Sequence, residues 1–306
     1  YYYWKKFAYI GIFLSIVLLS LLFVPGLGVK VGGATRWLRI GGFSFQVTEV
    51  VKVAMVIFLA HYLTKKIDHV KNFSRIFAIP LSVTAVIICL ILLQPDFGAS
   101  VIIVTAVMIM FYLAGSRVLH LAMLVSLLVP FAVVLVISES YRLQRWLSFR
   151  NPWNDPTNTG FHIIQSFLSF GSGGTFGVGI GNGMQKLFYL PEPHTDFILS
   201  VIAEEAGFIG IAIIIVLFAV LVARSFMISF NTPDLFGMLL SAGLTIILVL
   251  EASVNMAAVM GLIPTKGLVL PFLSYGGTSM LMSMAAVGII LNISSYRSVN
   301  RKDVGT

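Results

Sequence analysis

Long apolar runs recur along this chain, and they limit it to one broad class of fold. The composition is 58% hydrophobic and only 10% charged. A helix needs about 20 mostly apolar residues to cross a bilayer, and several runs reach or approach that length. The pattern predicts an all-α polytopic membrane protein with eight transmembrane helices. The predicted spans are Phe7–Val24, Val50–Leu63, Phe77–Leu93, Ala99–Ala114, Leu119–Ile137, Phe197–Ala223, Leu235–Ala258 and Thr278–Ile293.

The distribution of basic residues predicts how these spans are oriented. An even number of spans places both ends on one side, and the segments on that side hold eleven of the 20 Lys and Arg residues. The positive-inside rule assigns that side to the cytoplasm. Segments 25–48, 94–98, 138–196 and 259–277 then lie outside. We expect a single transmembrane domain over residues 1–306, in which 138–196 is a large outer loop between the fifth and sixth helices.

The charge and the cysteine count exclude several classes of function. The net charge of +8 suits anionic membrane lipids or a phosphorylated lipid substrate, and the positive-inside rule explains it equally well. The basic residues are scattered over short loops instead of forming one stripe, so no nucleic-acid partner is expected. The single cysteine, Cys89, excludes an internal disulfide and a cysteine metal site.

Acidic residues concentrate in one stretch, Lys186–Phe208, which holds four of the twelve. A carboxylate at the bilayer centre costs about 2.5–3.5 kcal/mol on the insertion scale, so acids beside an apolar run need an explanation. Asp196 follows Thr195, a good N-cap, and we expect it in the first turn of the sixth span, where the helix dipole favours a negative charge. Two interpretations stay open from spacing alone: a catalytic carboxylate, or a helix-start carboxylate.

Two further polar faces lie within predicted spans. Glu49 and Lys52 are three residues apart, so they share one helical face and can pair. That pair is either structural or part of a polar cavity. Glu251 and Asn255 are four apart and indicate a site of hydrogen bonding between helices.

Other residues near Asp196 give weaker signals. Glu204 and Glu205 point about 100° apart on a helix, so they are not a catalytic dyad, and we expect one to face a polar interior and the other a partner group. His194 stands without a second histidine at ligand spacing, which argues against zinc. A Mg²⁺ or Mn²⁺ ion shared with a substrate pyrophosphate stays open. Gly171–Gly183 holds seven glycines and allows either close packing or close approach to a ligand.

Five stretches together resemble the SEDS family of shape, elongation, division and sporulation proteins, which includes FtsW and RodA. They are RWLRIGGFSFQVTEVVKVA at 36–54, QPDFGAS at 94–100, IQSFLSFGSGG at 164–174, KLFYLPEPHTDFILSVIAEEAGFIG at 186–210 and PTKGLVLPFLSYGGTS at 264–279. The similarity runs in order through essentially the whole chain. The last two stretches are closer to the division branch than to the elongation branch.

The resemblance implies a ten-helix fold, of which the first two helices are absent from this sequence. It implies a peptidoglycan glycosyltransferase that polymerises lipid II during cell division, on the outer face of the bacterial cytoplasmic (inner) membrane. It also implies partners: a class B penicillin-binding transpeptidase and other divisome membrane proteins.

The resemblance also implies roles for individual residues. Asp196 matches the family's essential aspartate, and Glu49 and Lys52 match its cavity pair. Lys52, Arg36 and Lys266, in falling order, are candidates for stabilising a departing pyrophosphate. The motif residues with less defined roles are Arg36, Gln94, Asp96, Lys266, Ser274 and Tyr275.

Two other functions compete with the enzyme hypothesis. A transporter (flippase) for the lipid-linked precursor would have broken helices near the midplane, usually in two repeated halves, and no such repeat is visible in the sequence. A non-catalytic scaffold for a transpeptidase would keep its function when Asp196 is replaced by Asn.

Overall fold

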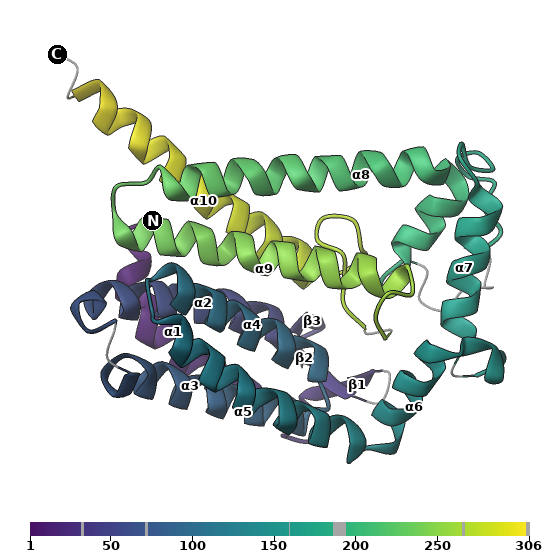
Figure 1. The fold of residues 1–306 in the computed structure, drawn as a ribbon, viewed down its shortest axis with the longest axis horizontal. Coiled ribbons are helices and arrows are strands. Elements are labelled where there is room, and N and C mark those ends of the chain that lie inside the picture. Colours follow the sequence, from purple (N-terminus) through teal and green to yellow (C-terminus); the bar gives the residue numbers. More distant parts are fainter. Residues whose placement is uncertain (32–33, 71–72, 159, 186–193, 265–266, 304–306) are drawn as a thin grey trace. The chain divides into compact units, whose positions relative to one another are not determined.

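The computed structural model describes residues 1–31, 34–70, 73–158, 160–185, 194–264 and 267–303. The chain is mostly helical, as predicted (Figure 1). It forms two compact units, each made of several sequence segments. Unit 1 comprises Tyr1–Leu121, Val222–Leu250 and Gly277–Thr306, and unit 2 comprises Ala122–Leu221 and Glu251–Gly276.

Eight of the described α-helices lie close to the predicted apolar runs, and the other two, α6 and α7, lie in the predicted outer loop. Their bounds are α1 Trp4–Leu21, α2 Val47–Lys65, α3 Phe73–Leu93, α4 Phe97–Leu113, α5 Val118–Ile137, α6 Ser140–Arg150, α7 Phe161–Gly173, α8 Ile198–Phe230, α9 Leu235–Val259 and α10 Gly277–Asp303. Two short 3-10 helices are η1 Ile67–His69 and η2 Pro152–Asn154.

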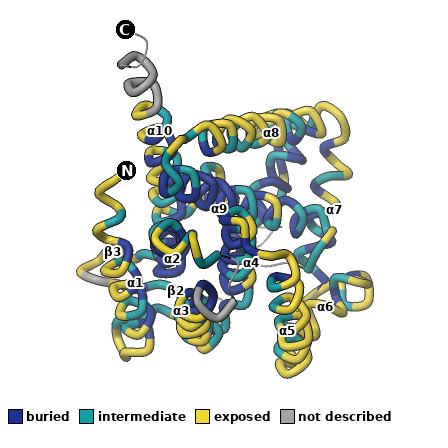
Figure 2. The backbone as a smooth tube through the Cα atoms, turned by 60° about the vertical axis from the view of Figure 1, so that its left-hand side comes forward, coloured by how far each residue is buried: buried dark blue, intermediate teal, exposed yellow. Residues whose placement is uncertain are grey.

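The helix α2 forms the centre of unit 1. It packs against α1, α3, α4 and α10, and nearly all of its side chains are buried, as the dark blue tube in Figure 2 shows. Its burial on all sides explains why it has no distinct polar face.

A small antiparallel sheet precedes α2 in unit 1. Its strands are β1 Gly28–Val31, β2 Ala34–Ile40 and β3 Phe43–Gln46, in the order β1-β2-β3. Gly41 and Gly42 connect β2 to β3 with φ of 55° and 94°, the positive values that a two-residue hairpin turn requires. The sheet was not predicted, because its strands have only four to seven residues and lie inside a predicted loop.

Unit 2 contains most of the predicted outer loop. The segment 140–150 forms the helix α6, and Trp146 and Trp153 are exposed. The core of the unit forms where the first part of α8 meets α9 and the segment after it. The core residues are Phe197, Leu199, Val201, Ala203, Ile211, Ala252, Met256, Val259 and Leu270.

Seven of the described helices are long and apolar enough to cross a membrane. The remaining predicted span, Ala99–Ala114, corresponds to α4, an apolar helix of 17 residues, so the count of eight is not confirmed. The helix α8 is longer than predicted and is interrupted at Gly207, where φ is 65° and ψ is −162°.

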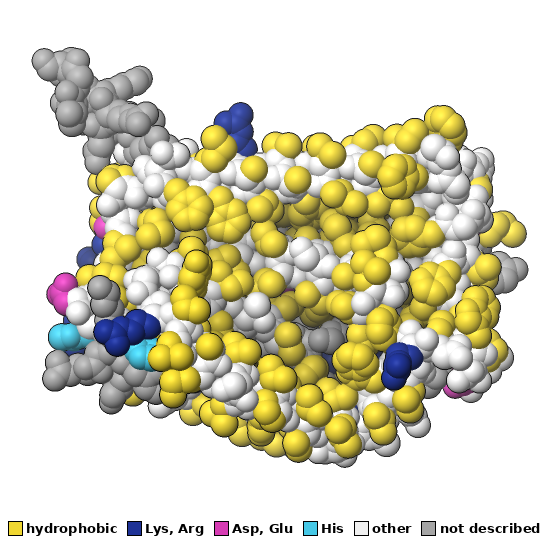
Figure 3. Space-filling model, viewed as in Figure 1, with side chains coloured by type: hydrophobic (Ala, Val, Ile, Leu, Met, Phe, Trp, Pro, Cys, Tyr) yellow, Lys and Arg dark blue, Asp and Glu magenta, His cyan; other side chains and the backbone are white. Residues whose placement is uncertain are grey.

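Apolar side chains dominate the surface. They cover most of the face in Figure 3, where charged side chains are few. Leu127, Val134 and Leu217 are each more than half exposed, on α5 and α8. A soluble protein would bury much of this surface, whereas lipid is a suitable solvent for it. The chain is therefore a multi-pass membrane protein.

Candidate active site

Asp196 lies in a turn of unit 2, two residues before α8 begins at Ile198. The backbone N–H groups of Ser200 and Val201 donate to the carbonyl oxygen of Phe197, at 2.9 and 3.4 Å. Helical hydrogen bonding thus starts at Phe197. The expectation that Asp196 sits inside the first helical turn was wrong by a short margin, because the carbonyls just before Phe197 have partners outside the helix.

Three successive backbone carbonyls hold this turn in place. The carbonyl of His194 accepts from the Tyr275 N–H at 2.7 Å. The carbonyl of Thr195 accepts from the Ser274 hydroxyl at 2.6 Å, and the carbonyl of Asp196 accepts from Asn255 Nδ2 at 3.0 Å. The backbone that carries the half-buried Asp196 side chain is therefore pinned at consecutive residues.

The donors to this turn come from two elements of unit 2. Asn255 lies on α9 and its Nδ2 also donates to the carbonyl of Leu268. The Ser274 hydroxyl also accepts from the backbone N–H of Leu270, at 2.7 Å. Asn255 was expected to hydrogen-bond between helices, but its link to the backbone of Asp196 was not predicted. The spacing of Glu251 and Asn255 identified a polar face without indicating its partner.

Ser274 and Tyr275 play different parts in this arrangement. Ser274 is buried and its hydroxyl bonds to the protein backbone, so it positions the turn. The Tyr275 side chain is 82% exposed, so its ring is accessible while its backbone N–H holds His194. The substrate-binding role expected for both residues stays a prediction.

The second group of expected site residues lies in unit 1, on and around α2. Lys52 Nζ donates to Glu49 Oε1 at 2.8 Å, and both side chains are almost completely buried. The predicted pairing of these two residues is confirmed. Because both charges are removed from water, the loss of either residue would leave the other charge buried without compensation and would destabilise the fold.

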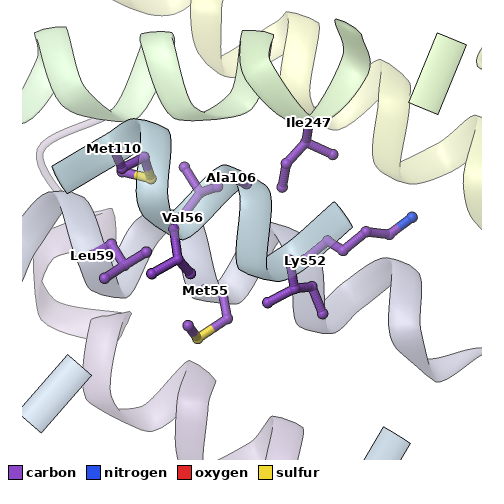
Figure 4. Close-up of a pocket in the computed structure, with 9 residues that line it drawn as sticks. Lys52, Met55, Val56, Leu59, Ala106, Met110 and Ile247 are labelled. Atoms are coloured by element: carbon purple, nitrogen blue, oxygen red, sulfur yellow. The ribbon is translucent and has the colours of Figure 1, made fainter. Parts of the chain in front are cut away.

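A small cavity borders Lys52 in unit 1. It is otherwise lined by apolar side chains, and Figure 4 shows the Lys52 ammonium pointing away from Met55 and Met110. The cavity has room for about one water molecule, about 10 Å³. It is too small to be the site of a disaccharide substrate.

Arg36, Asp96 and Gln94 connect the strand β2, the turn before α4 and the helix α1. Arg36 Nε lies 3.3 Å from Asp96 Oδ2, and an Arg36 guanidinium nitrogen donates to the carbonyl of Pro95 at 3.3 Å. Asp96 Oδ1 accepts from the Ala99 N–H at 3.2 Å and so caps α4. Gln94 Nε2 donates to the carbonyl of Leu19 at 3.1 Å.

The ion pairs weaken the expectation that Lys52 and Arg36 stabilise a departing pyrophosphate with a free positive charge. Glu49 neutralises Lys52 and Asp96 neutralises Arg36, so each pair carries little net charge toward a pyrophosphate. Lys266, the third candidate, lies outside the described residues. So do Pro191, Glu192 and Pro193 from the approach to Asp196.

No group of three or more His, Cys, Asp or Glu side chains that could hold a metal ion occurs within the described ranges. A divalent cation shared with the substrate therefore stays a prediction.

Glu204 and Glu205 serve a purpose that the sequence did not indicate. Both carboxylates accept hydrogen bonds from backbone N–H groups of residues 181–185, at the end of the glycine-rich segment and just after it, up to 24 residues earlier in the chain. Neither partner could be found from helical spacing, because both belong to a loop.

The expected residues thus form one group in unit 2 and two separate ion pairs in unit 1. Unit 2 brings Asp196 together with Ser274 and Tyr275, and adds Asn255. Unit 1 joins Glu49 to Lys52 and, separately, Arg36 to Asp96. Gln94 lies in the same turn as Asp96.

Comparison with known proteins shows which family the chain belongs to. Residues 1–299 match the family described as cell cycle protein, which groups FtsW, RodA and SpoVE. The chain belongs to this family. It is 48% identical to the "Probable peptidoglycan glycosyltransferase FtsW" of Trichlorobacter lovleyi, over 95% of this chain and 77% of that protein. It is 40% identical to the stage V sporulation protein E of Bacillus subtilis, over 97% of this chain and 81% of that protein.

Solved structures show the same fold for this FtsW/RodA/SpoVE family member. A structure titled "Structural coordination of polymerization and crosslinking by a peptidoglycan synthase complex" matches with a TM-score of 0.79 and 29% identity, over 96% of this chain and 82% of that chain. The rod shape determining protein RodA of Thermus thermophilus matches with a TM-score of 0.67 and 28% identity, over 96% and 79% of the two chains.

Proposed function

We propose that this protein is a peptidoglycan glycosyltransferase that polymerises lipid II during cell division, with Asp196 as its general base. The names of the FtsW relatives support the activity. The observation that carries the role of Asp196 is the set of three successive hydrogen-bonded carbonyls, because general-base catalysis requires a carboxylate at a fixed position.

The proposed reaction joins an acceptor sugar to a lipid-linked donor. The 4-hydroxyl oxygen of the acceptor GlcNAc attacks the anomeric carbon of the donor, and its proton passes to the Asp196 carboxylate. The bond from the anomeric carbon to the phosphate oxygen breaks, and lipid pyrophosphate leaves with the electron pair. A positioned general base typically contributes about 10²–10⁴-fold to such a step. Direct displacement inverts the anomeric centre.

The chain offers limited positive charge for the leaving group. Lys52 and Arg36 are both ion-paired, so either would act through hydrogen bonding more than through net charge. The requirement for charge stabilisation falls on Lys266 or on a divalent cation bound with the pyrophosphate.

We place the reaction on the outer face of the bacterial cytoplasmic membrane. The excess of basic residues at the predicted inner segments supports this orientation. We also propose a class B penicillin-binding transpeptidase as partner, because the structure titled as a peptidoglycan synthase complex that coordinates polymerisation and crosslinking contains a similar chain. Other divisome membrane proteins are proposed partners from the family resemblance.

The break in α8 does not favour the transporter alternative. Phe208–Phe230 alone is long enough to cross a bilayer, so Gly207 lies at one end of the span and not at its middle. At the break, backbone groups of residues 174–179 in the same unit form hydrogen bonds with α8.

Glycan synthesis by Asp196→Asn tests the proposal. Full-length protein with its transpeptidase partner is given labelled lipid II, and we expect glycan strands from the wild type and at least about 100-fold less from the variant. The matched control is Asp234→Asn, since this carboxylate caps α9 through the Gly237 N–H and Asn can accept the same bond. Equal melting profiles confirm that the variants fold. Wild-type polymerisation by Asp196→Asn, or net retention in the product linkage, would refute the mechanism.

A further inference from the structure

The break in α8 exchanges hydrogen bonds with the glycine-rich loop 174–185. In an unbroken helix, the N–H groups of Phe208 and Ile209 would donate to the carbonyls of Glu204 and Glu205. Here Phe208 and Ile209 donate instead to Gly174 and Thr175, at 2.9 and 3.2 Å.

The two carbonyls left free by the break also bond to the loop. Those of Glu204 and Glu205 accept from the N–H groups of Val178 and Gly179, at 2.9 and 3.1 Å. Two helical bonds are thereby replaced by four bonds between loop and helix, and the break fixes the loop in place.

Glycine is required at several positions of this contact. A Cβ atom on Gly177 would collide with the carbonyl of Glu205, and one on Gly173 with the carbonyl of Ala203. Gly171, in contrast, has open space around it and lies in α7. The requirement for glycine therefore follows the contact with α8 and does not extend to every glycine of the segment.

The carboxylates of the two glutamates hold the far end of the same loop. Glu204 Oε1 accepts from the Met184 N–H at 3.0 Å, and Glu204 Oε2 accepts from the Gln185 N–H at 3.1 Å. Glu205 Oε2 accepts from the Gly181 N–H at 3.0 Å. Glu204 is 4% exposed, so its bonds are made away from water, where hydrogen bonds to a charged acceptor are strong.

Gln185 and His194 are the two ends of the approach to Asp196. Glu204 holds Gln185, while Tyr275, Ser274 and Asn255 hold residues 194–196. Both anchors belong to unit 2. Glu204 itself lies on the first part of α8, which begins two residues after Asp196, so its bonds to Met184 and Gln185 tie the loop to the helical segment that follows Asp196.

We infer that Glu204 is a positioning residue for glycosyl transfer: by clamping the N–H groups of Met184 and Gln185, it helps to fix Asp196 for proton removal. The inference rests on the proposed function of Asp196. A displacement of about 1 Å at a reacting group can cost about 10²-fold in rate. Loss of the clamp therefore affects the rate of the chemical step more than substrate affinity.

The test compares Glu204→Gln with Gly183→Ala, and Gly171→Ala is the control. Gln offers one acceptor oxygen in place of two. A Cβ on Gly183 would lie 2.8 Å from Glu204 Oε2, so this variant disturbs the clamp and leaves the glutamate intact. Each variant, in full-length protein with its transpeptidase, is measured for kcat and KM with lipid II per folded molecule. Hydrogen exchange at Met184 and Gln185 reports on the clamp.

We expect Glu204→Gln and Gly183→Ala to exchange faster at Met184 and Gln185 and to lose about 10- to 100-fold in kcat, with KM changed less than about 3-fold. Gly171→Ala keeps wild-type values. The inference is overturned if kcat per folded molecule stays at the wild-type value, or if only KM changes. Asp196→Asn is assayed in parallel: if it is inactive while Glu204→Gln is fully active, only this inference fails. If Asp196→Asn is active, the proposed function itself fails.

Discussion

The buried pair of Glu49 and Lys52 allows a quantitative prediction about unit 1. Lys52 Nζ and Glu49 Oε1 are 2.8 Å apart, and the two residues are 2% and 5% exposed. Lys52→Met keeps most of the side-chain length and removes the cation, which leaves the carboxylate buried without it. Removing one partner of such a pair costs about 3–5 kcal/mol, so we expect the free energy of unfolding to fall by that amount.

Replacing both residues should restore most of the lost stability. Apolar replacement of a whole buried pair is often neutral or stabilising by about 1–4 kcal/mol. We therefore expect Glu49→Leu/Lys52→Met to unfold within about 1 kcal/mol of the wild type. Since each single substitution should cost at least about 3 kcal/mol, the coupling energy should be at least about 5 kcal/mol.

Denaturant unfolding in detergent micelles, followed by tryptophan fluorescence, measures the wild type, both single variants and the double variant. The matched control is the pair of Lys5 and Asp234, which is 3.7 Å apart with side chains 30% and 25% exposed. Lys5→Met should cost less than about 1 kcal/mol. If the double variant loses the sum of the two single losses, the pair is not coupled and the argument is refuted. A double variant that folds but makes no glycan would place the pair in the chemistry.

Two further predictions concern unit 2. Asn255→Ala removes the donor to the carbonyl of Asp196, so we expect kcat for lipid II polymerisation to fall about 10- to 100-fold with a nearly unchanged KM; unchanged kcat would contradict this. Gly207→Ala places a Cβ at φ 65° against the backbone of Gly177, and should lower the free energy of unfolding by at least about 2 kcal/mol. The control Gly171→Ala should change it by less than about 1 kcal/mol, and equal effects of the two substitutions would disprove the steric reasoning.

Hydrophobic runs predicted the helices of this protein well, because lipid requires each spanning segment to satisfy its own backbone. That requirement is local and can be read from consecutive residues. The pairing of Glu49 with Lys52 was predictable for a similar reason, since both residues lie on one turn of α2.

Features that depend on distant segments could not be predicted in the same way. The sheet β1-β2-β3 has short strands within a loop, and its pairing needs contacts that hydropathy does not record. The partner of Asp96 is Arg36, 60 residues earlier in the chain. Nothing in the spacing of either residue identifies the other.

Asp196 shows most clearly which features can be predicted from the sequence and which depend on the tertiary structure. Its residue type, its place beside an apolar run and the family motif around it all come from the sequence, and they were sufficient to select it as the candidate base. The sequence also determined that the chain is a helical membrane protein, because the length and composition of its apolar runs allow little else.

Only the tertiary structure decided what holds Asp196 in place. Its backbone is pinned by Asn255 from α9 and flanked by bonds from Ser274 and Tyr275, while Glu204 anchors the loop that leads toward it. Asn255, Ser274 and Tyr275 are separated from it by 59 to 79 residues, and Glu204 acts through backbone groups of the loop that precedes Asp196. Buried backbone groups must find hydrogen-bond partners wherever the fold brings donors near, and that choice depends on packing in three dimensions.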